Sequence, residues 1–301
     1  MEESRLIQRL REKLEEEDLA EGSRERVLID AKTLEQWYRG TYGDDIDPDD
    51  ISITSVDLAE YRTFILRSLK PITVRRKMAS IRKMLSLLDP KLLVELRFPK
   101  IPPSTDPAPS GFEKRERLAI LRATSKLSPR DRAIISLLMW TGARASSVAN
   151  AKLSNVEIKE RSGSITYDVA KGGRVYTVPL NAEAREALAV WIDERPEVGH
   201  DFLFTAERYP YASIGRWTIH EVWHRRMRRH LPKKIAEKIK GPHQARHGLA
   251  RMLLDQGTPL PDIAAILSHA SVATTAGIYC RPSEQDLRRH LDRAIGEDDE
   301  G

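Results

Sequence analysis

The sequence has a single cysteine and no long apolar run, and each scarcity excludes a class of protein. Cys280 alone rules out an internal disulfide and a metal site built on a cysteine cluster. No apolar run approaches the roughly 18 residues of a membrane span, so no membrane partner is expected. The charged amino terminus also lacks the apolar core of a signal peptide, so we expect a cytoplasmic protein.

Charge is unevenly distributed along a chain whose 301 residues leave room for about two domains. Residues 1–60 carry 8 Lys and Arg against 18 Asp and Glu, a net of −10. Residues 61–100 carry 11 against 2, a net of +9, and residues 101–301 carry 31 against 25, a net of +6. This segregation indicates a basic face turned toward a polyanion. An ordinary patchy surface is the alternative, and charge alone does not decide between them.

Apolar spacing predicts helices in the first hundred residues. A helix over 3–17 is followed by one over 23–38, for which Ser23 is a plausible N-cap, and by one over 56–69. The helix predicted over 73–88 has one apolar stripe, formed by Val74, Met78, Ile81, Leu85 and Leu88. Its cations lie off that stripe: Arg75, Arg76, Lys77, Arg82 and Lys83. A solvated face is the usual reading of a charge run, but no carboxylate interrupts these five, and we interpret them as contacts to a DNA backbone.

A proline-rich segment separates this half from the rest. Residues 99–111, PKIPPSTDPAPSG, hold five prolines without helical or strand periodicity. That composition is typical of a semi-rigid linker between domains, and a surface loop within one domain is the alternative.

The second half mixes helices with a hairpin. Helices are predicted over 113–123, 128–140, 182–194 and 283–295, and the second of these has Ser128 as its N-cap and ends near Gly142. Period-two segments 164–169 and 174–179 flank Lys171-Gly172-Gly173, which predicts a β-hairpin. Residues 223–240 hold eight Lys and Arg and one Glu, and we predict a second phosphate-contacting surface there, with these site residues: Arg225, Arg226, Arg228 and Arg229.

The stretch from Gly241 to Pro282 concentrates reactive side chains. His243 and Arg246 are three residues apart, which places them on one face of a helix. His269 follows, and Tyr279 comes ten residues later. A guanidinium grips phosphate, an imidazole moves a proton, and a tyrosine oxygen can be a covalent nucleophile. This combination indicates phosphate chemistry through a covalent tyrosyl intermediate.

The motifs HQARH and LSHASVATTAGIY resemble the carboxy-terminal signature of the tyrosine recombinases, the phage-integrase and Xer-like family. The phrase TGARASSVANAKL resembles the first signature box of that family, and TVRRKMASIRKML resembles a helix of its four-helix core-binding domain. The resemblance implies six catalytic residues in this chain: Arg144, Lys171, His243, Arg246, His269 and Tyr279.

The resemblance also implies a role for each of them. Two guanidinium groups, of Arg144 and Arg246, stabilise the charge that builds on the phosphate oxygens, and the hydroxyl of Tyr279 attacks phosphorus. A 3′-phosphotyrosyl bond and a free 5′-hydroxyl result, and the reverse reaction rejoins DNA without ATP.

The remaining roles concern proton transfer and phosphate binding. Lys171 is expected to protonate the leaving oxygen, His243 to assist as general base, and His269 to hydrogen-bond the phosphate. No metal and no cofactor are expected, because the arginines supply the positive charge.

We therefore expect a mainly α fold with a small β-sheet, in two domains joined by the proline-rich linker. Residues 1–98 are predicted to form a helical DNA core-binding domain, and residues 112–301 a mixed α/β catalytic domain. The expected partner is double-stranded DNA with a specific core site, bound by a homotetramer on two duplexes. In the absence of DNA the protein could be a monomer or a dimer, and the sequence does not decide between these states. Two alternatives remain: a type IB topoisomerase-like nicking-closing enzyme, and an architectural DNA-binding protein with impaired catalysis.

The chain departs from the family pattern at three places. Ser147 stands where an acidic residue is usual, and Ser268 stands where glycine is usual. The gap from His269 to Tyr279 is one residue longer than usual. His247 fits the pattern, and we assign it a structural role.

Overall fold

The computed structural model describes residues 3–43, 52–103, 111–168, 175–207, 212–268 and 271–279, with the side chain at position 274 excepted. The chain divides into two compact units, Met1–Asp106 and Pro107–Gly301, and each has its own core. The boundary lies in the proline-rich segment. The assignment of separate functions to the two units stays a prediction.

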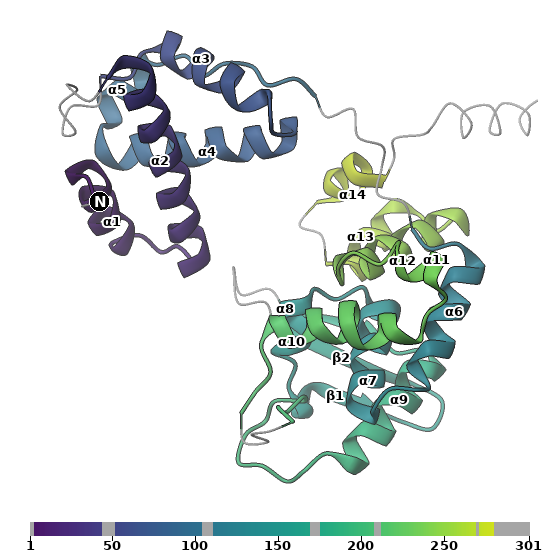
Figure 1. The fold of residues 1–301 in the computed structure, drawn as a ribbon. Coiled ribbons are helices and arrows are strands. Elements are labelled where there is room, and N and C mark those ends of the chain that lie inside the picture. Colours follow the sequence, from purple (N-terminus) through teal and green to yellow (C-terminus); the bar gives the residue numbers. More distant parts are fainter. Residues whose placement is uncertain are drawn as a thin grey trace, which may run out of the picture. The chain divides into compact units, whose positions relative to one another are not determined.

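The described part of the first unit is helical (Figure 1). Its helices are α1 (Arg5–Glu15), α2 (Glu21–Tyr42), α3 (Ser55–Leu66), α4 (Pro71–Leu88) and α5 (Pro90–Glu95). Helix α3 begins with a capping box in which Thr54 and Asp57 bond each other's backbone N–H groups. Helix α2 begins two residues before Ser23, at a cap without a side-chain hydrogen bond, so the predicted N-cap was wrong.

The predicted apolar stripe of α4 is the centre of the first core. Val74, Met78, Ile81 and Leu85 are buried, and Leu88 is partly buried at the end of the helix. Helix α4 packs against α1, α2 and α3 through this face. The period of the apolar residues therefore predicted the buried side correctly.

The second unit combines helices with one small sheet (Figure 1). Its elements are α6 (Lys114–Thr124), α7 (Pro129–Thr141), α8 (Ala145–Ala149), η1 (Leu153–Asn155), β1 (Val156–Ile158), β2 (Gly163–Asp168), β3 (Val175–Pro179), α9 (Ala182–Glu194), α10 (Arg216–Glu221), η2 (Val222–Arg226), η3 (Met227–His230), α11 (Lys233–Ala236), α12 (His243–Asp255), α13 (Leu260–Ile266) and α14 (Val272–Tyr279).

The sheet is antiparallel, in the order β1-β2-β3. Strands β2 and β3 pair with Ile165 opposite Val178 and Tyr167 opposite Tyr176, which confirms the predicted hairpin. Strand β1 has only three residues and was not predicted. The turn of the hairpin and the helix predicted over 283–295 lie outside the described residues.

Helix α7 is the buried axis of the second unit. It is buried on almost every side, and it packs against α9 and α12. The hydroxyl of Ser128 caps its start, as predicted, and Gly142 ends it in the left-handed conformation with φ of 62°. The end of α7 thus fixes where the next residues, including Arg144, leave the core.

The predicted fold class, mainly helical with a small sheet, is confirmed. Within the described ranges, no helix combines the length and the apolar character that crossing a membrane requires.

Candidate active site

The turn after α7 presents Arg144 to solvent. The hydroxyl of Thr141 accepts a hydrogen bond from the Ala143 backbone N–H at 3.2 Å and lies 3.2 Å from the hydroxyl of Tyr167 on β2. These bonds tie the turn to the sheet. Arg144 is the N-cap residue of α8, and its side chain is exposed. Its guanidinium makes no hydrogen bond or ion pair to any other residue that the structure describes.

Arg246 on α12 is buried against the same turn. Its side chain is only 1% exposed. Nη1 donates to the Gly142 carbonyl at 2.7 Å, and Nη2 donates to the Leu267 carbonyl at the end of α13. The buried Nε has no hydrogen-bond partner among the described atoms. Arg246 therefore joins the loop that carries Arg144 to the loop that leads to His269.

Electrostatics place Arg144, His243 and Arg246 in one neighbourhood. Burial and then the charge of Arg144 lower the pKa of Arg246 to about 10. His243 is exposed to solvent, but the atoms around its ring partly desolvate it, and this effect, followed by the charges of Arg246 and Arg144, lowers its pKa below the usual value. Two guanidinium groups that are far apart in the sequence thus act on one imidazole, which is the convergence that phosphate binding needs.

The hydroxyl of Tyr279 lies in this same neighbourhood. Tyr279 ends α14 and is 4% exposed, in a small cluster with Leu249, Ala250, Ile263 and Leu267. Its Oη is 2.7 Å from Nδ1 of His247. Burial raises the pKa of the phenol, while the charge of Arg246 opposes that rise.

The two histidines of α12 form a short row that leads to the phenol. The rings of His243 and His247 are 4.6 Å apart, edge to face, and the rings of His247 and Tyr279 are 5.5 Å apart. Both histidines line a cavity of about 590 Å³ whose wall also includes Phe112, Glu116 and Lys240. These two histidines are therefore reached from a cavity of their own unit.

Two of the six predicted catalytic residues, Lys171 and His269, lie outside the described residues. The other four, Arg144, His243, Arg246 and Tyr279, are brought together. The structure thus unites the termini of α7, α12 and α14, and the assigned roles stay predictions.

The departures from the family pattern have structural settings. Ser147 is buried in α8, one turn after Arg144. Ser268 adopts φ of 50°, the left-handed region that favours glycine, and a residue with a Cβ pays about 1–2 kcal/mol there. A glycine at position 268 would avoid that strain. The longer gap between His269 and Tyr279 includes residues 269 and 270, which lie outside the described residues.

Carboxylates neutralise part of the predicted basic face of α4. Asp30 on α2 binds Arg76 at 2.5 Å and Lys77 at 2.9 Å, and Glu17 binds Lys83 at 2.8 Å. The remaining cations of the set are exposed: Arg75, which donates to the Pro102 carbonyl, and Arg82, which lies over the ring of Phe98. A DNA contact from this face thus has its best candidates at these two positions.

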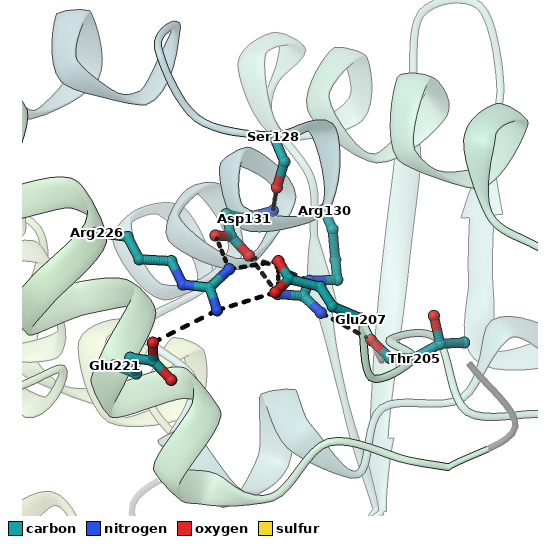
Figure 2. A network of polar contacts seen from close by, with 7 residues as sticks. All are labelled: Ser128, Arg130, Asp131, Thr205, Glu207, Glu221 and Arg226. Carbon is teal, nitrogen blue, oxygen red and sulfur yellow. Dashed lines mark hydrogen bonds and ion pairs between the residues drawn. The ribbon is translucent and has the colours of Figure 1, made fainter. Parts of the chain in front are cut away.

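The second predicted basic surface divides in the same way. Arg225 and Arg229 are exposed, and Arg228 lies against His224. Figure 2 shows that Arg226 instead points at carboxylates. It binds Asp131 at 3.0 Å, Glu207 and Glu221, and Glu207 in turn binds Arg130 at 2.9 Å.

This network has a structural role within the second unit. The hydrogen bonds that Arg226 donates to Glu207, together with the charge of Asp131, raise the pKa of Arg226, although burial opposes the rise. Arg226 thereby joins η2 to the start of α7 and to the segment of Glu207 (Figure 2). The charge of Arg226 is neutralised by carboxylates of the same unit, so among the four arginines predicted at this surface it is the least suited to contact a DNA phosphate.

A sequence model of the phage integrase family matches residues 112–286, more than half of the chain, including every candidate catalytic residue. The chain belongs to the phage integrase family. Its members include the tyrosine recombinases, so the predicted family and the predicted class of function, a site-specific recombinase with DNA strand-transferase chemistry, are confirmed.

Similar proteins are Xer recombinases. Tyrosine recombinase XerA of Pyrococcus furiosus is 30% identical over 66% of this chain and 65% of its own length. Tyrosine recombinase XerD of Haemophilus influenzae is 23% identical over 92% of this chain and 93% of its own. Among solved structures, XerH site-specific recombinase bound to the palindromic difH substrate has a TM-score of 0.70 at 19% identity, over 90% of this chain and 78% of that one. This last likeness shows the fold.

Sequence reasoning assigned His247 only a structural role, and the structure places it on the hydroxyl of Tyr279. A signal was present, because His247 is four residues after His243 and shares its helix face.

Proposed function

We propose that this chain cleaves and rejoins double-stranded DNA at a specific core site through a 3′-phosphotyrosyl bond at Tyr279. One observation carries the proposal: the phenolic oxygen lies within electrostatic reach of Arg246, and Arg246 is bonded to the turn that presents Arg144. A phenol beside one guanidinium, which is itself close to a second, is an arrangement that suits phosphoryl transfer to tyrosine.

The bonds change in a defined order. The Tyr279 oxygen attacks phosphorus, its O–P bond forms, and the P–O5′ bond breaks. The leaving 5′ oxygen takes a proton, for which Lys171 is the proposed donor. In the second step a 5′-hydroxyl of another strand attacks the phosphotyrosine, releases the phenol and restores a phosphodiester. Each step exchanges one phosphodiester bond for another, so the reaction needs no ATP.

The guanidinium groups divide the work. The side chain of Arg144 is exposed and makes no internal hydrogen bond within the described ranges, so it can meet a phosphate oxygen directly. Arg246 has used two of its nitrogens on backbone carbonyls, which fixes the position of its charge. One well-placed donor to a developing negative charge is worth about 3–4 kcal/mol. His243 and His269 complete the proposed set: His243 acts as general base, and His269 donates a hydrogen bond to the phosphate.

The arginines take the part that a divalent cation plays in many phosphoryl transfers, so we propose a reaction without metal and without cofactor. The exposed cations at Arg75, Arg82, Arg225 and Arg229 would hold the DNA backbone. Recombination joins two duplexes and needs four cleavages, so we propose a homotetramer on DNA, at work in the cytoplasm.

An architectural protein with impaired catalysis is the second candidate, and Ser147 favours it. No acidic side chain stands at that position to orient Arg144 or His243. Covalent capture separates the two candidates, because an architectural protein forms no bond to DNA.

The experiment uses a pool of nicked duplexes with randomised sequence, in which cleavage beside the nick releases a short fragment and traps the covalent protein. The wild-type chain should give an SDS-resistant adduct, also in the presence of EDTA. Tyr279→Phe should give none. Tyr42→Phe, which removes a hydroxyl from the other unit, should give the wild-type yield. Strand exchange between two duplexes then distinguishes a recombinase from a topoisomerase. An adduct that survives Tyr279→Phe would overturn the assigned nucleophile.

A further inference from the structure

The nucleophile already has a partner in this chain. The Tyr279 hydroxyl is 2.7 Å from Nδ1 of His247, a hydrogen-bond distance for a hydroxyl and a ring nitrogen. The tyrosine is almost fully buried, so this nitrogen replaces the water that would otherwise solvate the hydroxyl. Among the expected catalytic residues that the structure describes, none makes a hydrogen bond to this hydroxyl.

Several groups surround His247 and determine its state. Burial, then the proximity of His243 and Arg246, lower the pKa of its imidazole to about 4. At neutral pH the ring is therefore uncharged, and one of its two nitrogens accepts a hydrogen bond. With Tyr279 beside it, the tautomer that carries its proton on Nε2 leaves Nδ1 free to accept from the phenol.

We propose that His247 is the positioning residue for the nucleophile: its Nδ1 accepts the hydrogen bond of the Tyr279 hydroxyl and holds the phenolic oxygen beside Arg246. This inference rests on the proposed function of Tyr279. It assigns the His that follows Arg246 an active part in place of the structural role expected from the sequence.

The arrangement explains why one helix carries three of these groups. His243, Arg246 and His247 lie on the same face of α12, at offsets of three and four. Arg246 fixes the phosphate-binding turn through Gly142, and His247 fixes the phenol. A single rigid helix thereby sets the distance between the nucleophile and the charge that will stabilise its product.

A spectroscopic test detects the hydrogen bond without any DNA. Tyrosine labelled with ¹³C at Cζ gives one signal for each of the 8 tyrosines, and the loss of one in Tyr279→Phe assigns the signal of Tyr279. His247→Phe keeps a ring and removes the acceptor, so the Tyr279 signal should shift. His247→Asn places an amide oxygen near the Nδ1 position, so the signal should stay close to its wild-type value. Tyr42, bonded to Asp57 in the first unit, is the internal control and should not move.

The rate of adduct formation in a single turnover then tests the positioning role. His247→Phe should slow it by about two- to tenfold, the value of one neutral hydrogen bond, at unchanged DNA affinity. His247→Asn should return the rate to within about twofold of wild type. His247→Leu is the second variant without an acceptor, should the larger ring of Phe prevent folding.

Each result decides a separate point. An unmoved Tyr279 signal in both variants that lack the acceptor would overturn the proposed bond, and a shifted signal with an unchanged rate would overturn the positioning role. A wild-type chain that forms no adduct would overturn the proposed function and the positioning role with it, while the ¹³C signal still shows whether the bond exists.

Discussion

At the scale of single residues, Arg246 connects the largest number of parts of the site. Its two terminal nitrogens bond carbonyls that lie 104 and 21 residues away in the sequence. A buried guanidinium is costly to desolvate, and the two carbonyl bonds offset part of that cost. The side chain of Arg246 therefore fixes the positions of two loops of the site in addition to supplying positive charge.

Replacing Arg246 by Lys keeps the charge and loses the planar fork. One ammonium cannot reach both carbonyls in the geometry of two guanidinium nitrogens, so we expect a loss of about 1–3 kcal/mol in the free energy of unfolding. Chemical denaturation measures that loss. Arg251→Lys, at a half-buried position of the same helix where the charge beside Asp255 is kept, is the control and should change stability by less than about 0.5 kcal/mol. Equal stability of the two variants would show that the carbonyl bonds contribute little.

At the scale of elements, Gly142 ends α7 where no other residue fits. Its φ is 62°, and a Cβ built on it would lie 2.7 Å from Leu267 Cδ2 and 3.1 Å from Leu249 Cδ2. A side chain there would meet backbone strain and a clash together. The clash partners belong to α12 and the end of α13, the elements that Arg246 joins to this turn.

Gly142→Ala should therefore destabilise the second unit by about 2–4 kcal/mol and slow adduct formation by displacing Arg144. Gly40→Ala is the matched control, because nothing lies within 4 Å of a Cβ at Gly40 in the helix α2. It should stabilise α2 by about 0.5–1 kcal/mol. Thermal unfolding compares both variants, and a neutral Gly142→Ala would contradict the packing described for this turn.

Helices α2 and α4 are joined by a buried carboxylate. Burial alone would raise the pKa of Asp30, but hydrogen bonds from Arg76, Lys77 and Ser80 outweigh it, so the pKa is lowered. Because the pKa of Asp30 is lower in the folded protein than the value of about 4 in the unfolded chain, its ionised carboxylate stabilises the fold at pH values above about 4. That stabilisation is lost as the pH falls through the pKa of the folded state.

Asp30→Asn should therefore cost about 3 kcal/mol at neutral pH, because the cations lose their buried partner. The difference from wild type should stay constant above about pH 5 and shrink as the pH falls below about 4. Hydrogen exchange of the α2 and α4 amides measures it within this unit. A difference that does not change with pH would mean that Asp30 carries no charge in the folded protein.

The elements that sequence predicted are those with a local signal. Residues close together in the chain determine each of four features: the apolar stripe of α4, the cap at Ser128, the end of α7 at Gly142 and the hairpin. The wrong N-cap at Ser23 and the missed strand β1 show the limit, since a cap can lack a side-chain bond and three residues give no period.

What sequence could not predict depends on distant partners. Arg76 and Lys77 looked free because Asp30 is 46 and 47 residues away. Arg226 looked like a phosphate contact because Asp131 is 95 residues away. The site residues could be named from their order in the chain, but the bond between His247 and Tyr279 required the fold.

At the scale of the whole molecule, the basic character is smaller than the count of cations suggests. Charges bound by internal carboxylates cannot release counterions from DNA, and exposed ones can. The exposed pair Arg225 and Arg229 and the paired Arg226 belong to one short segment, which makes a direct comparison possible.

The double variant Arg225→Ala and Arg229→Ala should make the dependence of log K on log salt shallower by about 2, since each phosphate contact contributes about 0.9. Arg226→Ala should leave the slope unchanged and lower the unfolding temperature by breaking the network of Figure 2. Binding titrations on one duplex at several salt concentrations measure the slopes. Equal slope changes in the two variants would refute the distinction between exposed and paired cations.

The central claim, covalent chemistry at the phenol beside Arg246, is tested most directly by mapping the trapped adduct. Nuclease and protease digestion followed by peptide mass spectrometry should find a nucleotide on Tyr279, linked through its 3′-phosphate, with a free 5′-hydroxyl on the released fragment. A nucleotide on any other residue, or linkage through a 5′-phosphate, would contradict the account.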